Sequence, residues 1–235
     1  MQGLMPIMII PVLATLISGL GMYLIIGQPI VWLQEVLTNF LNNMRGGSKF
    51  VLGAILGAMA TFDFGGPVNK TMSLFSDGLL IDGIYGPEAV KFIGSIIPPF
   101  GITLSYFLTK NKYTKAEKEA LKAAFPMGIC MITEGVIPIA ARDLVRVVGS
   151  CVVASAIAGG LAMTWGVGSP VPHGGMFVVP LFEKPWLFCL ALLIGTVICG
   201  VMVSLWKKPV TEEDEEFEDL DNKNISSDDI SFTLE

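Results

Sequence analysis

Three stretches of the sequence place ionisable or hydrogen-bonding side chains between apolar runs. They are Asp63–Lys70 in TFDFGGPVNK, Thr133–Asp143 in ITEGVIPIAARD, and Pro170–Gly175, which reads PVPHGG. Ionisable groups at membrane depth are costly and usually face a cavity or a partner. Short membrane segments broken by glycine and proline are the best sequence sign of a ligand site between membrane helices. The repeated pattern therefore favours a binding site built from interrupted segments.

Glu134 is the leading candidate for direct chemistry, as a polyol or cation ligand or as a general base. A carboxylate can accept two hydroxyl hydrogen bonds, which suits a polyol. The sequence GVIP after it favours an interrupted helix. The structural alternative is an ion pair with Arg142 or Lys70 that only holds the segment together. Thr133, directly before Glu134, is a further candidate for substrate contact.

Asp63, Asn69 and Lys70 border the sequence GGPV. The two glycines permit backbone angles that other residues avoid and let a ligand approach the main chain. The proline prevents a continuous helix, and Asn69 can both donate and accept hydrogen bonds. An ordinary surface turn explains these residues equally well. Lys70 is expected to pair with a carboxylate or to extend towards the membrane surface.

His173 is the only histidine, and PVPHGG offers no helical core for it to fill. A hydrogen bond to a substrate and a capping or loop role both fit this position. Arg142, Asp143 and Arg146 are expected to form a structural cluster at a helix start, with Asp143 and Arg146 three residues apart. These charges are therefore assigned to the scaffold rather than to the site.

Several chemistries are not indicated by the sequence. The four cysteines lie in apolar stretches without metal-ligand spacing. Phosphate-loop and dinucleotide fingerprints are missing, so no metal and no cofactor are predicted. The basic segment 110–122 has a single tyrosine and no stacking platform, which argues against nucleic-acid binding.

The composition indicates an all-α, polytopic membrane protein. The chain is 52% hydrophobic and 15% charged, with a mean hydropathy of +0.66, whereas soluble domains carry about 25% charged residues. A helix in the membrane interface is expected at 29–43. Two short apolar arms around the break at 63–70 predict a re-entrant hairpin over 50–81. Membrane spans are expected at 5–27, 87–109, 144–163 and 186–206.

The charges divide the chain into two regions. Residues 1–209 form the predicted membrane domain, and residues 210–235 form an acidic tail predicted to be disordered and solvated. Segment 211–235 contains eleven acids and one lysine. The basic loop around 110–122 and the pair Lys207-Lys208 are expected on the cytoplasmic side, which also places the tail in the cytoplasm.

Three motifs together resemble one known family. GGPVNK at 65–70, ITEGVIPIAARD at 132–143 and PHGG at 172–175 are similar to those of the fructose-type membrane component, enzyme IIC, of the bacterial phosphoenolpyruvate-dependent sugar phosphotransferase system. The likeness runs from about residue 4 to 208. The resemblance implies a multi-pass protein of the bacterial cytoplasmic membrane that binds fructose or a related hexose and carries it inward by an elevator-like movement.

The resemblance also implies partners and residue roles. A IIB domain on another chain would donate the phosphoryl group, with IIA upstream of it, so whether this chain counts as an enzyme is left open. Glu134 would be the main sugar ligand and the base for the phosphorylated hydroxyl. Asn69 and His173 would be further sugar contacts, with Asp63 and Lys70 as supports. A homodimer in the lipid bilayer is expected.

One departure from the family pattern produces alternatives. Members normally have further membrane segments before the one that begins here at Met5, so the chain resembles a IIC domain that lacks its N-terminal helices. A truncated or split-gene subunit without autonomous transport is one alternative. An ion-coupled secondary transporter that uses Asp63 or Glu134 is another.

Overall fold

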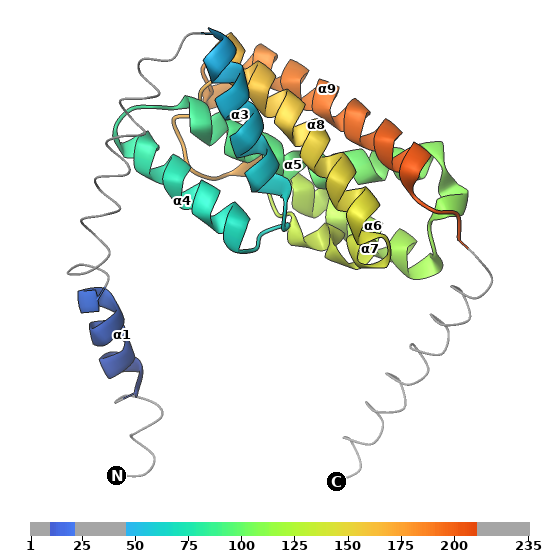
Figure 1. The fold of residues 1–235 in the computed structure, drawn as a ribbon, viewed down its shortest axis with the longest axis horizontal. Helices are drawn as coiled ribbons and strands as arrows, with labels where there is room; N and C mark the ends of the chain where they lie inside the picture. The colour runs from blue at the N-terminus through green and yellow to red at the C-terminus, as the bar shows by residue number, and fades with distance from the viewer. Residues whose placement is uncertain (1–9, 22–45, 211–235) are drawn as a thin grey trace. The chain divides into compact units, whose positions relative to one another are not determined.

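The computed structural model describes residues 10–21 and 46–210 of the chain (Figure 1). The first part is a single helix, α1 (Ile10–Gly21), which forms a unit of its own. Most of the predicted span 5–27, the predicted interfacial helix 29–43 and the acidic tail lie outside the described residues. The second part is a helical bundle, and it contains all three predicted motifs.

The bundle confirms the all-α fold class. Within residues 46–210 the regular elements are helical, apart from one isolated β-bridge between Gly168 and Glu183. The α-helices are α3 (Gly46–Thr61), α4 (Pro67–Ile81), α5 (Gly86–Leu108), α6 (Lys115–Ile129), α7 (Ile137–Arg142), α8 (Leu144–Trp165) and α9 (Pro185–Trp206). Short 3₁₀ helices are η3 (Lys110–Lys112), η4 (Glu134–Val136) and η5 (Gly175–Leu181).

Three helices of the described residues are long and apolar enough to cross a membrane. They are α5, α8 and α9, with 23, 22 and 22 residues, and they confirm the spans predicted at 87–109, 144–163 and 186–206. A helix of this length rises about 33 Å, enough for the apolar part of a bilayer. Exposed Trp186 and Trp206 lie at the two ends of α9, where membrane proteins concentrate interfacial aromatics.

Helix α5 forms the core of the bundle. It packs against α3, α8 and α9, and in Figure 1 these three helices lie side by side with α5 behind them. Nearly all its residues from Pro87 to Ile102 are buried. The helix continues through Pro98 and Pro99. Such prolines are tolerated because neighbouring membrane helices can satisfy the freed backbone groups.

Helices α3 and α8 approach closely through small residues. A Cβ atom on Gly159 would lie 2.5 Å from the carbonyl oxygen of Gly53, and one on Gly57 would lie 2.9 Å from the carbonyl carbon of Ser155. Gly53 and Gly57 are four residues apart, as are Ser155 and Gly159. Small residues at this spacing let membrane helices approach until their backbones touch.

The break at 63–70 joins two helices into a hairpin. Helix α3 ends at Thr61, and α4 begins at Pro67 after a tight turn. Within this turn Phe64 has φ 45° and Gly65 has φ 100°. Two short helices around a turn are the arrangement that the apolar arms predicted. Their depth in a membrane remains a prediction.

The basic segment 110–122 is largely helical, which differs from the predicted loop. Helix α6 begins at Lys115, where Thr114 and Glu117 form a capping box. The Glu117 amide donates to Thr114 Oγ1 at 3.3 Å, and Oε2 of Glu117 accepts from the Thr114 amide at 2.9 Å. This pairing satisfies two free donors of the first turn, and the alanine- and lysine-rich sequence KAEKEALKAA continues the helix.

Candidate functional site

Asp63 caps helix α4 from outside the helix. Its Oδ2 accepts the amide of Val68 at 2.6 Å, and its Oδ1 accepts the amide of Asn69 at 3.0 Å. The N-cap residue, Gly66, has no side chain to do this, and the first amides of a helix need acceptors. Both carboxylate oxygens therefore hold the hairpin, which fits a supporting role for Asp63.

Asn69 and Lys70 lie in the first turn of α4 and differ in exposure. Asn69 is 7% exposed, and its Nδ2 donates to the carbonyl oxygen of Ala60 at the end of α3. That bond joins the two arms of the hairpin, and it leaves the amide oxygen and the second Nδ2 hydrogen of Asn69 for a ligand. Lys70 is exposed.

Glu134 lies against the glycine turn of the hairpin. It opens η4, after a turn in which Met131 has φ 68°, and its side chain is exposed. A Cβ atom added to Gly65 would lie 2.9 Å from the carboxyl carbon of Glu134. The first two motifs therefore meet at this contact, although Gly65 and Glu134 are 69 residues apart in the chain. Thr133, next to Glu134, is buried.

The alternative ion pairs of Glu134 with Arg142 or Lys70 stay predictions. Arg142 Nη1 lies 3.5 Å from Oε2 of Glu117, so this guanidinium has a carboxylate partner on α6. The exposed Lys70 belongs to the first turn of α4. An exposed carboxylate beside a flexible glycine can accept hydrogen bonds from an incoming hydroxyl.

The third motif packs behind the second. Gly175, with φ 61°, is buried, and a Cβ atom there would lie 2.8 Å from the Cα of Cys130. The turn 130–133 leads directly into Glu134. His173 is exposed, and its Nδ1 contacts the carbonyl oxygen of Pro172. The Glu134 side chain thus lies against Gly65 of the first motif, and Gly175 of the third motif packs against the residues just before the second. A contact between His173 and Glu134 stays a prediction.

A cavity of about 560 Å³ lies between the hairpin turn and α8. Apart from Asp63 its lining is apolar: Phe62, Leu144, Val145, Val148, Gly149 and Val152. Val145 is 82% exposed and Leu144 58%. A surface of this kind suits a hydrocarbon chain better than a polyol, because a sugar needs several polar partners.

A buried charge cluster was missed by the sequence reasoning. Lys91 Nζ lies 2.5 Å from Oδ1 of Asp77 and 2.5 Å from Oε1 of Glu88. Glu88 is 0% and Lys91 1% exposed, and the contact with Glu88 lacks hydrogen-bond geometry. The cluster joins α4 to α5. A glutamate and a lysine three residues apart inside the apolar span 87–109 were the available signal.

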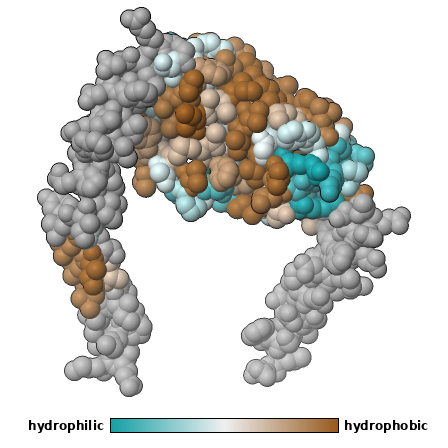
Figure 2. Space-filling view, in the orientation of Figure 1, coloured by the Kyte–Doolittle hydropathy of each residue, from teal (hydrophilic) through white to brown (hydrophobic). Residues whose placement is uncertain are grey.

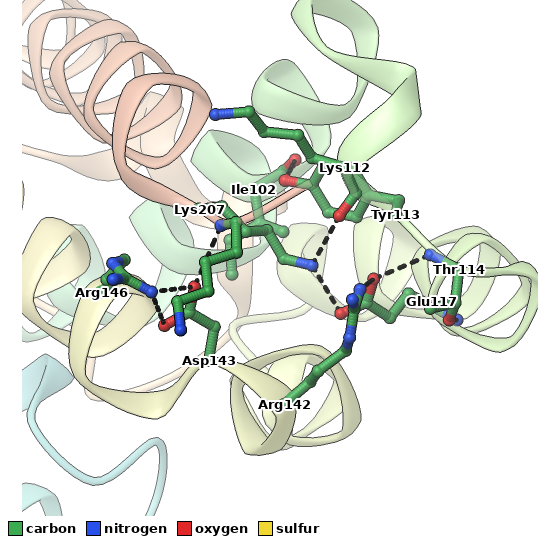
Figure 3. A network of polar contacts seen from close by, with 10 residues as sticks. Ile102, Lys112, Tyr113, Thr114, Glu117, Arg142, Asp143, Arg146 and Lys207 are labelled. Carbon is green, nitrogen blue, oxygen red and sulfur yellow. Dashed lines mark hydrogen bonds and ion pairs between the residues drawn. The ribbon is translucent and has the colours of Figure 1, made fainter. Parts of the chain in front are cut away.

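A second polar network closes the end of the bundle that holds α6 and α7 (Figure 3). Lys207 Nζ donates to Oε1 of Glu117 at 2.6 Å and to the Lys112 carbonyl at 2.9 Å, and lies 4.4 Å from the Tyr113 ring centroid. Burial lowers the pKa of Lys207, and the attraction of Glu117 opposes this change. Burial also raises the pKa of Tyr113.

The predicted charge cluster at the end of the second motif forms part of this network. Arg146 Nη1 lies 3.2 Å from Oδ2 of Asp143, which confirms their pairing. The same Asp143 oxygen accepts the backbone amide of Lys208 at 3.2 Å. The end of the ITEGVIPIAARD segment is therefore tied to the residues that follow α9.

Comparison with known proteins identifies relatives of this chain. The chain is 42% identical over 215 residues to the "PTS system fructose-specific EIIB'BC component" of Xanthomonas campestris, covering 90% of this chain and 37% of that protein. It is 42% identical over 205 residues to the "PTS system fructose-specific EIIC component" of Haloferax volcanii, covering 87% and 55%. The chain thus spans between about a third and just over half of these relatives' length.

A shorter relative is covered more fully. The "Fructose permease IIC component" of Bacillus amyloliquefaciens is 38% identical over 213 residues, which are 91% of this chain and 70% of that protein. No family model matches the chain. No solved structure matches it either. The extent and identity of these alignments, together with the three motifs, show that the chain belongs to the family of fructose-specific IIC components of the phosphotransferase system.

Proposed function

We propose that the chain is the membrane-embedded, sugar-binding part of a phosphotransferase permease for fructose or a related hexose. The observation that carries this proposal is the exposed carboxylate of Glu134 against Gly65, which joins two motifs through a position without a side chain. Asn69, Thr133 and His173 are the further proposed sugar contacts. Asp63 and Lys70 are proposed as supports. For Asp63 the reason is that it already accepts two amides of α4.

Glu134 would orient one sugar hydroxyl and take its proton. The hydroxyl oxygen would then attack the phosphorus of a phosphocysteine on a IIB partner, whose thiolate leaves. Such a transfer depends mainly on positioning and electrostatics, and a positioned general base contributes about 10²–10⁴-fold. Fused relatives named EIIB'BC and EIIABC support IIA and IIB as partners.

The proposed membrane orientation rests on charge. The two basic segments expected on the cytoplasmic side contact each other, since Lys112 Nζ donates to the Ser204 carbonyl at 2.7 Å and Lys207 pairs with Glu117. The positive-inside rule would place both segments on the same, cytoplasmic side, and their contact agrees with this. The cytoplasmic tail, the homodimer and an elevator movement of the transport domain belong to the same proposal.

Uptake of labelled fructose tests the proposal. In cells without native fructose transport but supplied with IIA and IIB, the chain should restore uptake, and Glu134→Ala and Glu134→Gln should lower it by about 100-fold or more. Glu119→Gln, an exposed acid on α6, is the control and should leave uptake intact. Unchanged uptake by Glu134→Gln would remove the assigned role.

The same cells separate the alternatives. Uptake driven by an imposed proton or sodium gradient in the absence of IIB would favour an ion-coupled transporter. Uptake that requires a companion membrane chain would favour a split subunit. The use of both Asp63 oxygens in capping α4 speaks against Asp63 as a coupling-ion ligand.

A further inference from the structure

Basic side chains gather at the end of the bundle that holds α6 and α7. We call the side chains of 110–122, 142–146 and 207–208 the basic cap. It contains nine lysines and arginines against Glu117, Glu119 and Asp143. On the face shown in Figure 2, the strongest hydrophilic patch lies over this end of the bundle.

Four of the nine basic side chains of the cap are exposed. Lys110, Lys115, Lys122 and Lys208 are exposed. Internal contacts use the side chains of Lys112, Arg142, Arg146 and Lys207. Lys122 forms an exposed pair with Glu119. On α6, Lys115, Lys118 and Lys122 follow the spacing i, i+3, i+7 and therefore share one face of the helix.

The chain leaves the bundle at this same cap. The backbone amide of Val210 donates to the carbonyl oxygen of Asn111 at 3.4 Å, and the amide of Lys208 donates to Asp143. Two residues later the sequence EEDEEFED begins, at 212–219, with seven acids in eight residues. We call this segment the acidic run. Three residues, 209–211, connect it to Lys208 of the basic cap.

We propose that the acidic run docks on the basic cap of its own chain. Charge complementarity supports this pairing, and a short tether gives the run an effective concentration of about millimolar. The dimensions also fit. The stripe from Lys115 to Lys122 rises about 10 Å, whereas eight extended residues reach up to about 28 Å. In this position the negative charge of the run would also be favoured by the dipole of α6, whose N-terminus belongs to the cap.

Lysine acetylation in the full-length chain tests the docking. In neutral detergent at about 20 mM NaCl, the exposed lysines of the cap should react about threefold more slowly than when all seven acids of the run are changed to amides. At about 500 mM NaCl this difference should disappear, because the Debye length falls below 5 Å. Lys70, exposed in α4, is the internal reference.

A matched variant and a direct measurement complete the test. Asp228→Asn with Asp229→Asn removes charge outside the run and should leave the lysine rates unchanged. Zero-length carbodiimide coupling should join lysines of the cap to acids of 212–219 within one chain. Both sets of substitutions lie outside the bundle, and an unchanged melting temperature verifies that the fold is intact.

Three results would overturn the proposal. The first is equal lysine reactivity with and without the charges of the acidic run. The second is an equal acceleration by the Asp228→Asn, Asp229→Asn variant. The third is protection that appears only when anionic lipid is added and that does not depend on the run, which would identify lipid headgroups as the occupant of the cap.

Discussion

At the residue scale, Gly65 controls the contact between the first two motifs. Gly65→Ala would place a methyl group against the Glu134 carboxylate and would also occupy a φ of 100°. We expect fructose uptake to fall by about tenfold or more, because displaced catalytic groups cost about 10²-fold for shifts of 1 Å. Uptake per molecule of protein in the membrane is the measurement.

Gly83→Ala is the matched control for this substitution. Gly83 has φ 76°, and a Cβ atom there would meet nothing within 4 Å. Both variants carry backbone strain of about 1–2 kcal/mol, but only Gly65→Ala moves Glu134. Equal losses of uptake in the two variants would mean that strain alone, and not the contact with Glu134, explains the result.

Burial determines how much two otherwise similar ion pairs contribute to the free energy of unfolding. Lys91–Glu88 and Lys122–Glu119 are both three residues apart with N–O distances of 2.5 Å. Lys91→Met leaves buried acids unpaired, so we expect a loss of about 3–5 kcal/mol in unfolding free energy. Lys122→Met breaks an exposed pair, whose contribution is about 0–1 kcal/mol.

Denaturant titration of both variants in the same detergent checks this difference. A small loss for Lys91→Met would show that its two acids are stabilised without the ammonium group. Sequence reasoning overlooked this cluster because it treated 87–109 as an apolar span. The same reasoning singled out Glu134, whose side chain is exposed in the structure, while its role in sugar binding stays a prediction.

At the element scale, α3 and α8 depend on their small residues. Gly159→Ala would bring a methyl group 2.5 Å from the Gly53 carbonyl oxygen and 2.9 Å from Cγ1 of Val90. The Gly53 backbone cannot shift as easily as the end of a flexible side chain. We therefore expect a loss of about 1–3 kcal/mol in unfolding free energy. Thermal unfolding in detergent is the measurement.

Gly149→Ala, on the same helix, provides the comparison. Its Cβ atom would meet only the ring of Trp206, at 3.8 Å, and alanine favours a helix by about 1 kcal/mol over glycine. We therefore expect equal or higher stability. A loss as large as that of Gly159→Ala would argue against close packing as the cause.

The sequence predicted helices correctly where the apolar runs were long. The three spans were predicted correctly, within about two residues at each end. Helix α6 was partly predicted as a loop, because its lysines were interpreted as membrane-flanking charge. The capping box of Thr114 and Glu117 was visible in the sequence and marks the true helix start.

At the scale of the whole molecule, Glu117 and Lys207 join segments 90 residues apart. Burial lowers the pKa of Lys207 in the folded protein, whereas in the unfolded chain this pKa keeps its ordinary value of about 10.5. Between these two values the unfolded state binds more protons, so stability rises with pH. Glu117→Gln removes the opposing attraction, which should lower the folded pKa further and steepen this rise.

Melting temperatures between about pH 7.5 and pH 10 test this prediction. Glu117→Gln should be less stable than the parent near neutrality and should approach it at high pH, while Glu119→Gln should run parallel to the parent. Glutamine can still complete the capping box. The range stops near pH 10 because the raised pKa of Tyr113 makes stability fall above that point. Parallel profiles for Glu117→Gln and the parent would contradict the prediction.

The sequence by itself determined the helical membrane class, the three long spans and the three polar breaks. These features depend on local composition and on the length needed to cross a bilayer, which each segment carries alone. The two-helix hairpin followed from the same local rules.

The tertiary structure alone decided which of these groups meet. It assigned Asp63 to capping α4, engaged Asn69 with Ala60, left Glu134 exposed beside Gly65, and joined Lys91 to Asp77. Such contacts join residues distant in the chain and depend on how closely the backbones approach. A single sequence contains no signal for that distance, because it is set by the packing of the whole bundle.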